Sequence, residues 1–537
     1  MRRVISLLLF ITIFIGIFSG CSEQENKENL LRIAVDVDLS SMDQNIATDG
    51  LSFEAIAGTI EGLYNNDKDG KLIPAIAKEY EMSKDGLVYT FKLRSDVKWS
   101  NGDKVTASDF VFAWRRLLDP DTASEYNFIG EVAGVKNAAK VVEGKVKKEE
   151  LGIKAEDDTT LIIELDRPVP YFLSLMAFPT FFPLNEKFVT EKGENYALDA
   201  ENLLANGPFK MKSWKKGYGF ILEKNKDYYD AKNVSVDGLD YKVIKDNQTA
   251  ALKYDNNELD VVKLSAELVD KYKSNQAYTQ YAAGYIWYVT PNNKTELFSN
   301  LNARKAIQHA INKQHIVDKI LNDGSIVADY IVPKDLAIGP DQKDFRENSG
   351  TFSEYDKELA VEYWDKAKKE LGKSEFKVEF LFDDSETIKK TAEFIQAELE
   401  TNLPGLKVEL KSQPKKNRID LMTDGDYEIG LTRWGPDYAD PLTYLDLFLT
   451  DVINNYPNYT DKEYDKLVKS SANELSGDAK ARWDAMISAE EILLDKGAAI
   501  VPLYQTGYSY LVNPKVKGIE DHTVGTPFIY RNVEVNN

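Results

Sequence analysis

The stretch 431-LTRWGPDYADP-441 follows a segment in which apolar and polar or small residues alternate from Tyr427 onward. An alternation with a period of two predicts a β-strand, and Gly435-Pro436 predicts its end. An aromatic residue, Trp434, and an acid, Asp437, therefore lie just beyond the end of a strand.

Two more alternating runs precede this strand, at residues 376–382 and 406–410, with a helical apolar pattern at 388–399 between them. The order predicts a β-α-β unit that leads into a third strand. In open α/β sheets ligands collect beyond the carboxyl ends of the strands, so Trp434 and Asp437 lie where a binding site is expected. The spacing is equally consistent with a structural turn that has Trp434 in the core and Asp437 as its cap.

Four segments carry a family resemblance. Residues 434–441 fit the pattern W-x-x-D-Y-x-[DE]-P, and longer blocks lie at 88–120 (beginning VYTFKLRSDVKW), 206–229 and 302–321. Together they resemble the peptide-binding lipoproteins of ABC importers, the extracytoplasmic solute-binding proteins of the oligopeptide type. The likeness covers nearly the whole mature chain. It implies an α/β fold of the two-lobed periplasmic-binding-protein type with an extra subdomain, a hinge of two crossing strands, and ligand in the cleft between the lobes.

A chain of 537 residues is too long for a single core. The resemblance divides it into a signal peptide (1–20), a tether (21–29), lobe I (30–285 with 505–537, including a subdomain at about 60–195) and lobe II (286–504). Aromatic strands predicted at 278–290 and 501–512 connect the lobes.

The first residues have the pattern of a lipoprotein signal. Arg2-Arg3 is followed by an apolar run at 4–18 that is short for a membrane span, and Ser19-Gly20 precede Cys21. Cys21 is the only cysteine, so no internal disulfide can form and acylation explains it. Phe18 stands where this pattern usually has Leu, and an uncleaved signal anchor is the alternative. We expect a mature chain that begins at Cys21 and is held by lipid at the outer face of the cytoplasmic membrane.

The resemblance also implies roles for individual residues. Asp437 matches the acid that binds the amino terminus of the peptide, and Tyr126 matches a tyrosine that approaches the same amine; a half-buried core tyrosine is the alternative for Tyr126. The loop at 48–52 matches a segment that lines the cleft with backbone groups. The remaining ligand contacts expected are Arg433, Trp434, Gly435, Gly50 and Leu51.

Backbone groups are common to all peptides, so a cleft that adds the ligand as a strand binds many sequences. The expected edges are the strand end at 433–435 and the loop around Gly50. Short-peptide relatives have a basic residue three positions before the tryptophan of the motif, whereas this chain has Leu431. We therefore expect no fixed anchor for the peptide carboxylate, and we expect the cleft to accept peptides of several lengths.

Two patterns predict scaffold. Residues 65–70 superficially resemble a calcium loop, but Ile76 stands where a bidentate Glu is needed, so we interpret them as a hairpin turn. Thr106 with Asp109 predicts a capped helix start.

The net charge of −21 and the sequence pI of about 4.8 disfavour a nucleic-acid partner. The longest basic run, 415-KKNR-418, is interpreted as a solvated loop. The resemblance implies peptides and the membrane-embedded permease subunits with their ATPases as partners, and we expect a monomer.

No catalytic motif is evident. The three histidines, His309, His315 and His522, are not spaced as a metal pair on one helix face, so neither a metal nor a cofactor is expected. A secreted hydrolase that uses Asp437 and Asp440 as a carboxylate pair is the alternative from another class. Within binding proteins the alternatives are a receptor for dipeptides or for a peptide pheromone, or one for a sugar or nickel.

Overall fold

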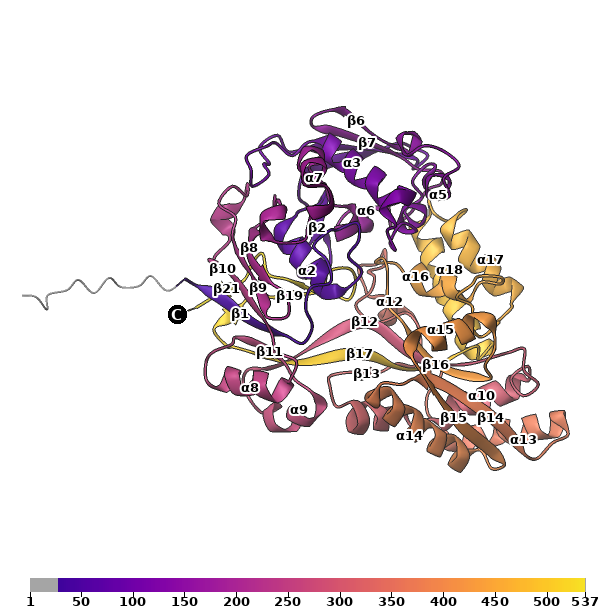
Figure 1. The fold of residues 1–537 in the computed structure, drawn as a ribbon. Helices are drawn as coiled ribbons and strands as arrows, with labels where there is room; N and C mark the ends of the chain where they lie inside the picture. Colours follow the sequence, from indigo (N-terminus) through magenta and orange to yellow (C-terminus); the bar gives the residue numbers. More distant parts are fainter. Residues whose placement is uncertain (1–27, 537) are drawn as a thin grey trace, which may run out of the picture.

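The computed structural model describes residues 28–536 and shows a mixed α/β molecule of two lobes (Figure 1). The predicted signal peptide, Cys21 and most of the tether lie outside the described residues. A sheet of eleven strands extends through both lobes in the order β15-β14-β16-β12-β17-β11-β1-β10-β9-β8, with β13 (Ile326–Val327) beside β17. Within residues 28–536 no helix is long and apolar enough to cross a membrane.

Two long antiparallel strands connect the lobes, β12 (Tyr278–Pro291) and β17 (Val501–Val512). Both strands were predicted from the sequence and are confirmed. Their pairing shifts register between Ala282 and Ile286, so the ladder is interrupted near the middle of β12. The exact residues at which one lobe ends and the other begins stay a prediction.

The β-α-β unit that leads into a third strand is confirmed. It consists of β14 (Phe376–Asp383), α14 (Glu386–Asn402), β15 (Leu406–Gln413) and β16 (Ile429–Trp434), and β14 runs parallel to both β15 and β16. From position 429 to position 432 every residue of β16 is buried, so both faces of this strand are covered rather than one. The reason is its central position between β14 and β12.

The interpretation of residues 415–418 as a solvated loop is wrong. They begin α15 (Lys415–Asp424), which places Arg418 on the inner face, 3% exposed. Its Nε lies 3.0 Å from Asp383 Oδ1, and another guanidinium nitrogen donates to Thr432 Oγ1 at 2.8 Å. Lys415 and Lys416 remain on the exposed side, because positions within one helical turn face different directions.

In lobe I, β1 (Leu30–Val35) lies parallel to its neighbours β10 (Gly238–Val243) and β11 (Val261–Lys263). Beyond β10 follow β9 (Gly219–Lys224) and β8 (Phe209–Lys215). Helix α2 (Gly50–Thr59) begins inside the segment expected to be a loop. The Asp49 side chain caps it by accepting from the Ser52 N–H at 3.0 Å.

The part of lobe I predicted as a subdomain contains its own sheet, β4 (Ala77–Met82), β5 (Val88–Leu93), β7 (Thr160–Glu164) and β6 (Ile153–Asp157), packed against α3 (Ala107–Leu118). The predicted helix start is confirmed, since the Asp109 carboxylate accepts from the Thr106 N–H at 2.8 Å. The predicted hairpin turn is confirmed as well: it joins β2 (Tyr64–Asn66) to β3 (Leu72–Pro74), and Asp67 accepts from two backbone N–H groups of the turn.

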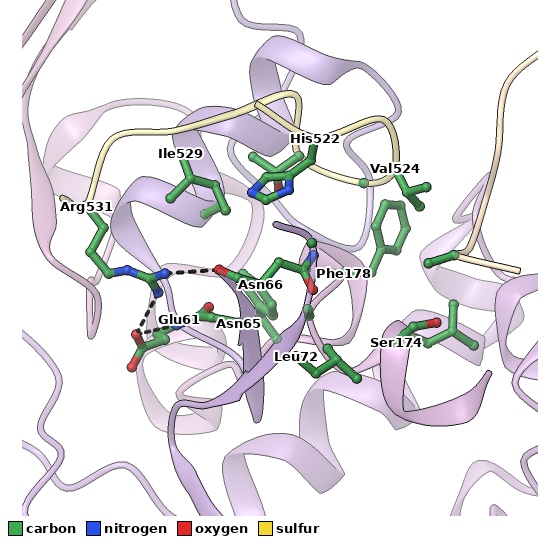
Figure 2. Close-up of a pocket in the computed structure, with 18 of the residues that line it drawn as sticks. Glu61, Asn65, Asn66, Leu72, Ser174, Phe178, His522, Val524, Ile529 and Arg531 are labelled. Carbon is green, nitrogen blue, oxygen red and sulfur yellow. Dashed lines mark hydrogen bonds and ion pairs between the residues drawn. The ribbon is translucent and has the colours of Figure 1, made fainter. Parts of the chain in front are cut away.

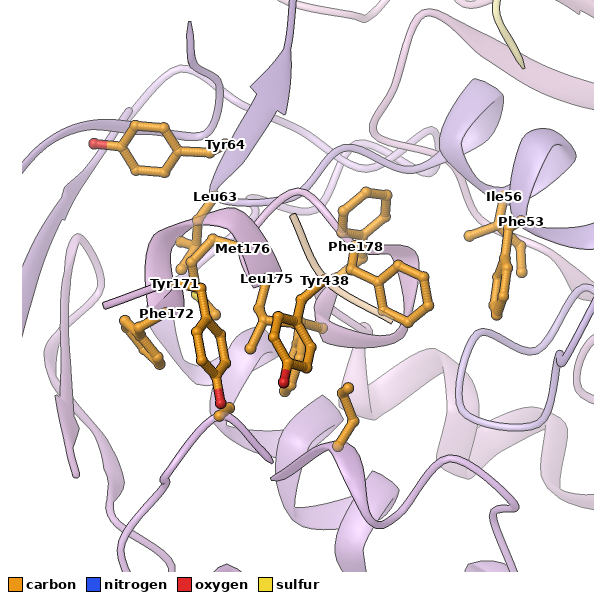
Figure 3. Packing of buried hydrophobic residues seen from close by; sticks show 14 of the residues in the cluster. Phe53, Ile56, Leu63, Tyr64, Tyr171, Phe172, Leu175, Met176, Phe178 and Tyr438 are labelled. Carbon is orange, nitrogen blue, oxygen red and sulfur yellow. The ribbon is translucent and has the colours of Figure 1, made fainter. Parts of the chain in front are cut away.

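The core of lobe I extends to residues that are distant in the sequence (Figure 3). Phe53 and Phe178 meet edge to face with ring centres 5.0 Å apart. Tyr171 stacks on Tyr438 at 4.0 Å and 13°. The segment directly after Asp437 therefore packs against the subdomain.

Residues 28–536 also contain thirteen further α-helices and four further short strands. They are α4 (Ile129–Val132), α5 (Ala138–Val142), α6 (Phe172–Leu175), α7 (Glu186–Lys192), α8 (Asn247–Asp255), α9 (Ala266–Tyr272), α10 (Leu301–Ala310), α11 (Lys313–His315), α12 (Phe345–Asn348), α13 (Lys357–Leu371), α16 (Leu442–Leu445), α17 (Lys462–Ala472), α18 (Ala479–Glu491), β18 (Val516–Lys517), β19 (Glu520–Asp521), β20 (Phe528–Ile529) and β21 (Glu534–Val535).

Candidate ligand-binding site

A hollow of about 560 Å³ opens beyond the carboxyl end of β16. Its lining brings together five of the residues predicted to contact ligand: Tyr126, Arg433, Trp434, Gly435 and Asp437. Tyr126 comes from lobe I and the other four from the end of β16 and the turn after it. This is the place where the α/β sheet was expected to bind a ligand.

Asp437 is half-buried, and its carboxylate has no hydrogen-bond or ion-pair partner among residues 28–536. Burial raises the pKa of this carboxyl from 3.8 to about 6. The backbone N–H of Asp437 donates to Thr443 Oγ1 at 3.0 Å, which fixes the turn. A carboxylate that has lost water without gaining a partner favours a cationic or hydrogen-bond-donating ligand group.

Tyr126 lies in the same hollow and is itself half-buried. Its ring packs edge-on against Phe53 and tilted against Phe178, with 5.7 Å between ring centres in each case. Burial, and secondarily the charge of Asp437, raise the pKa of its hydroxyl, so Tyr126 stays protonated as a donor. The structure therefore makes Tyr126 both a core aromatic and a neighbour of Asp437.

Two more groups in the hollow are unpaired. The Trp434 indole nitrogen is buried and has no hydrogen-bond partner within the described chain. The Arg433 guanidinium lies over the rings of Tyr285 and Trp287, at 4.5 and 5.4 Å, and forms no ion pair with any acid of residues 28–536. The hollow is thus lined by a carboxylate and a cation that form no ion pair within residues 28–536, and by Trp434, whose buried indole N–H has no hydrogen-bond partner there.

One edge of β16 is free where it borders the hollow. On one side β16 pairs with β12 along its whole length, from Ile429 to Trp434. On the other side it pairs with β14 only at Ile429 and Gly430. From Leu431 onward this second edge has no strand partner in the described chain, so an extended ligand backbone can add to it.

The sequence reasoning missed Arg418, which lines the hollow together with Lys415. Its guanidinium is already held by Asp383 and Thr432, so it stiffens the wall of the hollow. A signal was present, because Arg418 and Met422 are four residues apart and both are buried on one face of α15.

Gly50 and Leu51 are not brought to this hollow. They border a second one, of about 210 Å³, with Tyr508 on its wall. Burial raises the pKa of Tyr508, and the Arg433 charge opposes that rise. Glu54 also lines the second hollow; burial raises its pKa to about 8, and the Tyr241 hydroxyl donates to it at 2.9 Å.

The carboxylate pair of the hydrolase alternative is not formed in the hollow. Asp440 is 6% exposed, and both of its oxygens accept from Arg482, at 2.7 and 2.8 Å. His309 contacts the Glu354 carbonyl, and His315 stacks on Phe394. Among residues 28–536 no group of three potential metal ligands comes together.

Leu431, at the position of the basic residue in short-peptide relatives, is fully buried in the core of lobe II. It faces neither hollow. The first hollow instead has Arg433, two residues further along the same strand, as a cation that could bind a ligand carboxylate.

Two lobes joined by two strands, with unpartnered polar groups in the hollow beside them, define a two-lobed solute-binding protein. Residues 71–456 match the family described as bacterial extracellular solute-binding proteins, family 5 Middle, and the chain belongs to this family.

The sequences and structures of similar proteins align with almost the whole of this chain. A dipeptide-binding protein of Lactococcus lactis is 33% identical over 98% of this chain and 98% of its own length. The substrate-binding domain of an oligopeptide ABC transporter from Bacillus anthracis is 43% identical, with a TM-score of 0.76, and the match covers 95% of this chain and 99% of that one. OppA of Listeria monocytogenes, in a structure bound to peptide, is 41% identical with a TM-score of 0.76, and the match covers 95% of this chain and 100% of that one.

Proposed function

We propose that this protein captures extended peptides between its lobes and delivers them to an ABC importer in the membrane. Family membership and the names of the relatives support the ligand class. The observation that carries the proposal is the unpartnered Asp437 carboxylate at the end of a free strand edge.

Asp437 binds the amino terminus of the peptide. A protonated amine that enters a cleft needs a counter-charge and hydrogen bonds, and a carboxylate supplies both. The amine in turn stabilises the ionised form of an acid that burial penalises. Tyr126 adds a neutral donor in the same hollow.

The free edge of β16 binds the peptide backbone, so the sequence of the ligand is read only weakly. The Trp434 indole N–H supplies a donor for a peptide carbonyl. Arg433 supplies a partner for a peptide carboxylate or an acidic side chain, although Leu431 provides none. Waters in a hollow of this size adapt to different side chains.

Calorimetric titration tests this function, with unrelated peptides of two to nine residues in free and amino-acetylated forms. We expect similar affinities across sequences at a fixed length, and weak binding of every acetylated form. Equal affinity for free and acetylated peptides would remove Asp437 from its role. One tightly bound sequence among indifferent ones would identify a pheromone receptor instead, and cleaved peptide in the recovered ligand would identify a hydrolase.

Closure of the lobes accompanies capture, with the hinge in β12 and β17, whose pairing is interrupted between Ala282 and Ile286. Small-angle scattering should show contraction when a bound peptide is added. An unchanged profile would contradict closure.

Lipid on Cys21 holds the protein at the outer face of the cytoplasmic membrane. Two or more acyl chains on one residue give stable attachment, whereas one gives marginal binding. Replacing Cys21 with Ala should release the protein or leave an unprocessed precursor, which fractionation and intact-mass measurement distinguish. A variant that is processed and attached like the natural protein would refute the anchor.

A further inference from the structure

A third space, a cavity of about 60 Å³, has Asp437 in its lining. Figure 2 shows most of the other residues around it. Its walls come from α2, the β2–β3 hairpin, residues 174–182 and residues 522–531. Asp437 and Ala439 close it toward lobe II, so Asp437 lines both this cavity and the open hollow.

Three polar atoms that line this cavity are buried and have no hydrogen-bond partner in the described chain: Glu61 Oε2, Thr526 Oγ1 and His522 Nε2. Glu61 is 3% and Thr526 6% exposed. Burial lowers the pKa of His522 to about 4, so its ring is neutral at physiological pH. Buried polar atoms need partners, and all three of these atoms belong to residues that line this cavity.

Carboxyl groups outnumber cations in the lining of the cavity, and burial raises the pKa of Glu61 while hydrogen bonds and the Arg531 charge oppose that rise. Figure 2 shows Arg531 between the Asn66 carbonyl and Glu61. Arg531 lies 3.9 Å from Glu61 and 3.8 Å from Glu520, so one cation is shared by two carboxylates. Glu61 Oε1 accepts from Asn65 at 2.7 Å and from the Tyr228 hydroxyl at 2.8 Å, which leaves Oε2 for a donor from elsewhere.

We infer that this cavity receives the side chain of the first residue of the peptide and selects one that is neutral, donates hydrogen bonds and is of moderate size. The inference rests on the proposed function, because Asp437 has to hold the amine. The first Cα is bonded directly to that amine, so its side chain begins beside Asp437, at the wall of the cavity. The backbone meanwhile continues along β16 into the open hollow.

The volume sets the size limit. One water needs roughly 10 to 15 Å³ by this measure, so the cavity holds about four to six water-sized groups. A Gln side chain fits this space and donates to Glu61 Oε2. A Glu side chain of the same size places a second carboxylate beside Glu61, and a Trp side chain is too large.

Calorimetric titration of the mature protein with Gln-Ala-Ala, Glu-Ala-Ala, Ala-Ala-Ala and Trp-Ala-Ala tests the inference. We expect the Gln peptide to bind at least about tenfold more tightly than the Glu peptide, since a gained hydrogen bond and an avoided like-charge contact both favour it. The Trp peptide should bind about tenfold more weakly than the Ala peptide. Equal binding of the Trp and Ala peptides would overturn the inference while leaving peptide capture intact.

Glu61→Gln assigns the preference to one atom. The variant keeps Oε1 as an acceptor for Asn65 and Tyr228 and changes Oε2 into a donor, so the preference for Gln over Glu should fall about tenfold or invert. Asp109→Asn is the matched control, a buried acid of the same lobe that lies outside the cavity, and it should keep the preference. An unchanged preference in Glu61→Gln would overturn the inference.

A second variant does not depend on the Glu61 network. Ala57→Leu fills the cavity from α2 and should weaken the Gln peptide by about tenfold while the Ala peptide keeps its affinity; Ala57→Ser is its control. Equal loss for both peptides would overturn the inference. Failure of all four peptides to bind the natural protein would overturn the proposed function, and this inference with it.

Discussion

Asp437 and Asp440 are three residues apart, yet their surroundings are opposite. The Asp440 carboxylate is buried and makes two hydrogen bonds to Arg482, whereas the half-buried Asp437 carboxylate has no partner in the described chain. Asp437 lines the open hollow and Asp440 does not. The difference separates an acid that holds the fold from an acid that is left for a ligand.

The two acids also illustrate how a binding site is kept ready. The Asp440–Arg482 pair, the Tyr171–Tyr438 stack and the bond from the Asp437 N–H to Thr443 fix the segment on which Asp437 lies. The ionised Asp437 carboxylate is destabilised by burial, as its raised pKa shows, and only a bound cation would offset this penalty. The surrounding segment is held rigid by contacts within the protein, whereas the Asp437 carboxylate has no partner there. A ligand can therefore supply that partner without the segment having to rearrange.

Asp440→Asn should produce the largest effect, a decrease in the free energy of unfolding. It leaves the Arg482 charge buried without a counter-charge, which costs about 3 to 5 kcal/mol. Urea denaturation measures this loss. Unchanged stability would show that the two acids are equivalent and would end the comparison.

Asp437→Asn should act on binding instead. Peptide affinity should fall by about 3 kcal/mol, because the bound ammonium loses its partner. The empty variant should be at least as stable as the natural protein at pH 7, since a penalised charge is removed. Titration and urea denaturation of both proteins test this pair of outcomes, with Asp384→Asn, an exposed acid of the same hollow, as control.

The pKa of Asp437 sets a pH dependence. The empty protein binds this proton with a pKa of about 6, and the peptide ammonium favours the ionised form, so affinity should fall about tenfold per pH unit below pH 6. The folded pKa is above the unfolded value of 3.8, so this group lowers stability as pH rises from about 4 to 6. The difference in unfolding free energy between the natural protein and Asp437→Asn should therefore grow across that window and then level off. A constant difference would contradict the raised pKa.

The smallest effect is expected at Trp434. Its indole N–H has no partner in the described chain, whereas the Trp364 N–H donates to the Pro404 carbonyl at 2.9 Å. Trp434→Phe should weaken peptide binding by about 1 kcal/mol without destabilising the empty protein, and Trp364→Phe should destabilise without affecting binding. Affinity unchanged in Trp434→Phe would show that the ligand does not use this donor.

Local patterns predicted elements well where the period was clear. The apolar stripe of α14 and the strands β14 and β15 follow from spacing, and β12 and β17 were predicted from their aromatic content. Arg418 was misjudged because a charged run predicts solvent exposure, and its burial depends on Asp383 and Thr432, which are distant in the sequence. Gly50 was placed in a loop because residues 48–52 match a cleft-lining segment of the family, although the Asp49 cap begins a helix there.

The sequence by itself determined the α/β class, the family resemblance and the small set of residues around Trp434 and Asp437 from which the site is built. Spacing could not distinguish Asp437 from Asp440, since both are acids in one short turn. Only the tertiary structure shows that Asp440 pairs with Arg482 and that Asp437 lines the hollow. The physical reason is that desolvation and pairing depend on groups from remote segments, and no local period encodes such contacts. Glu61, His522 and Arg531 around the cavity of about 60 Å³ are an example.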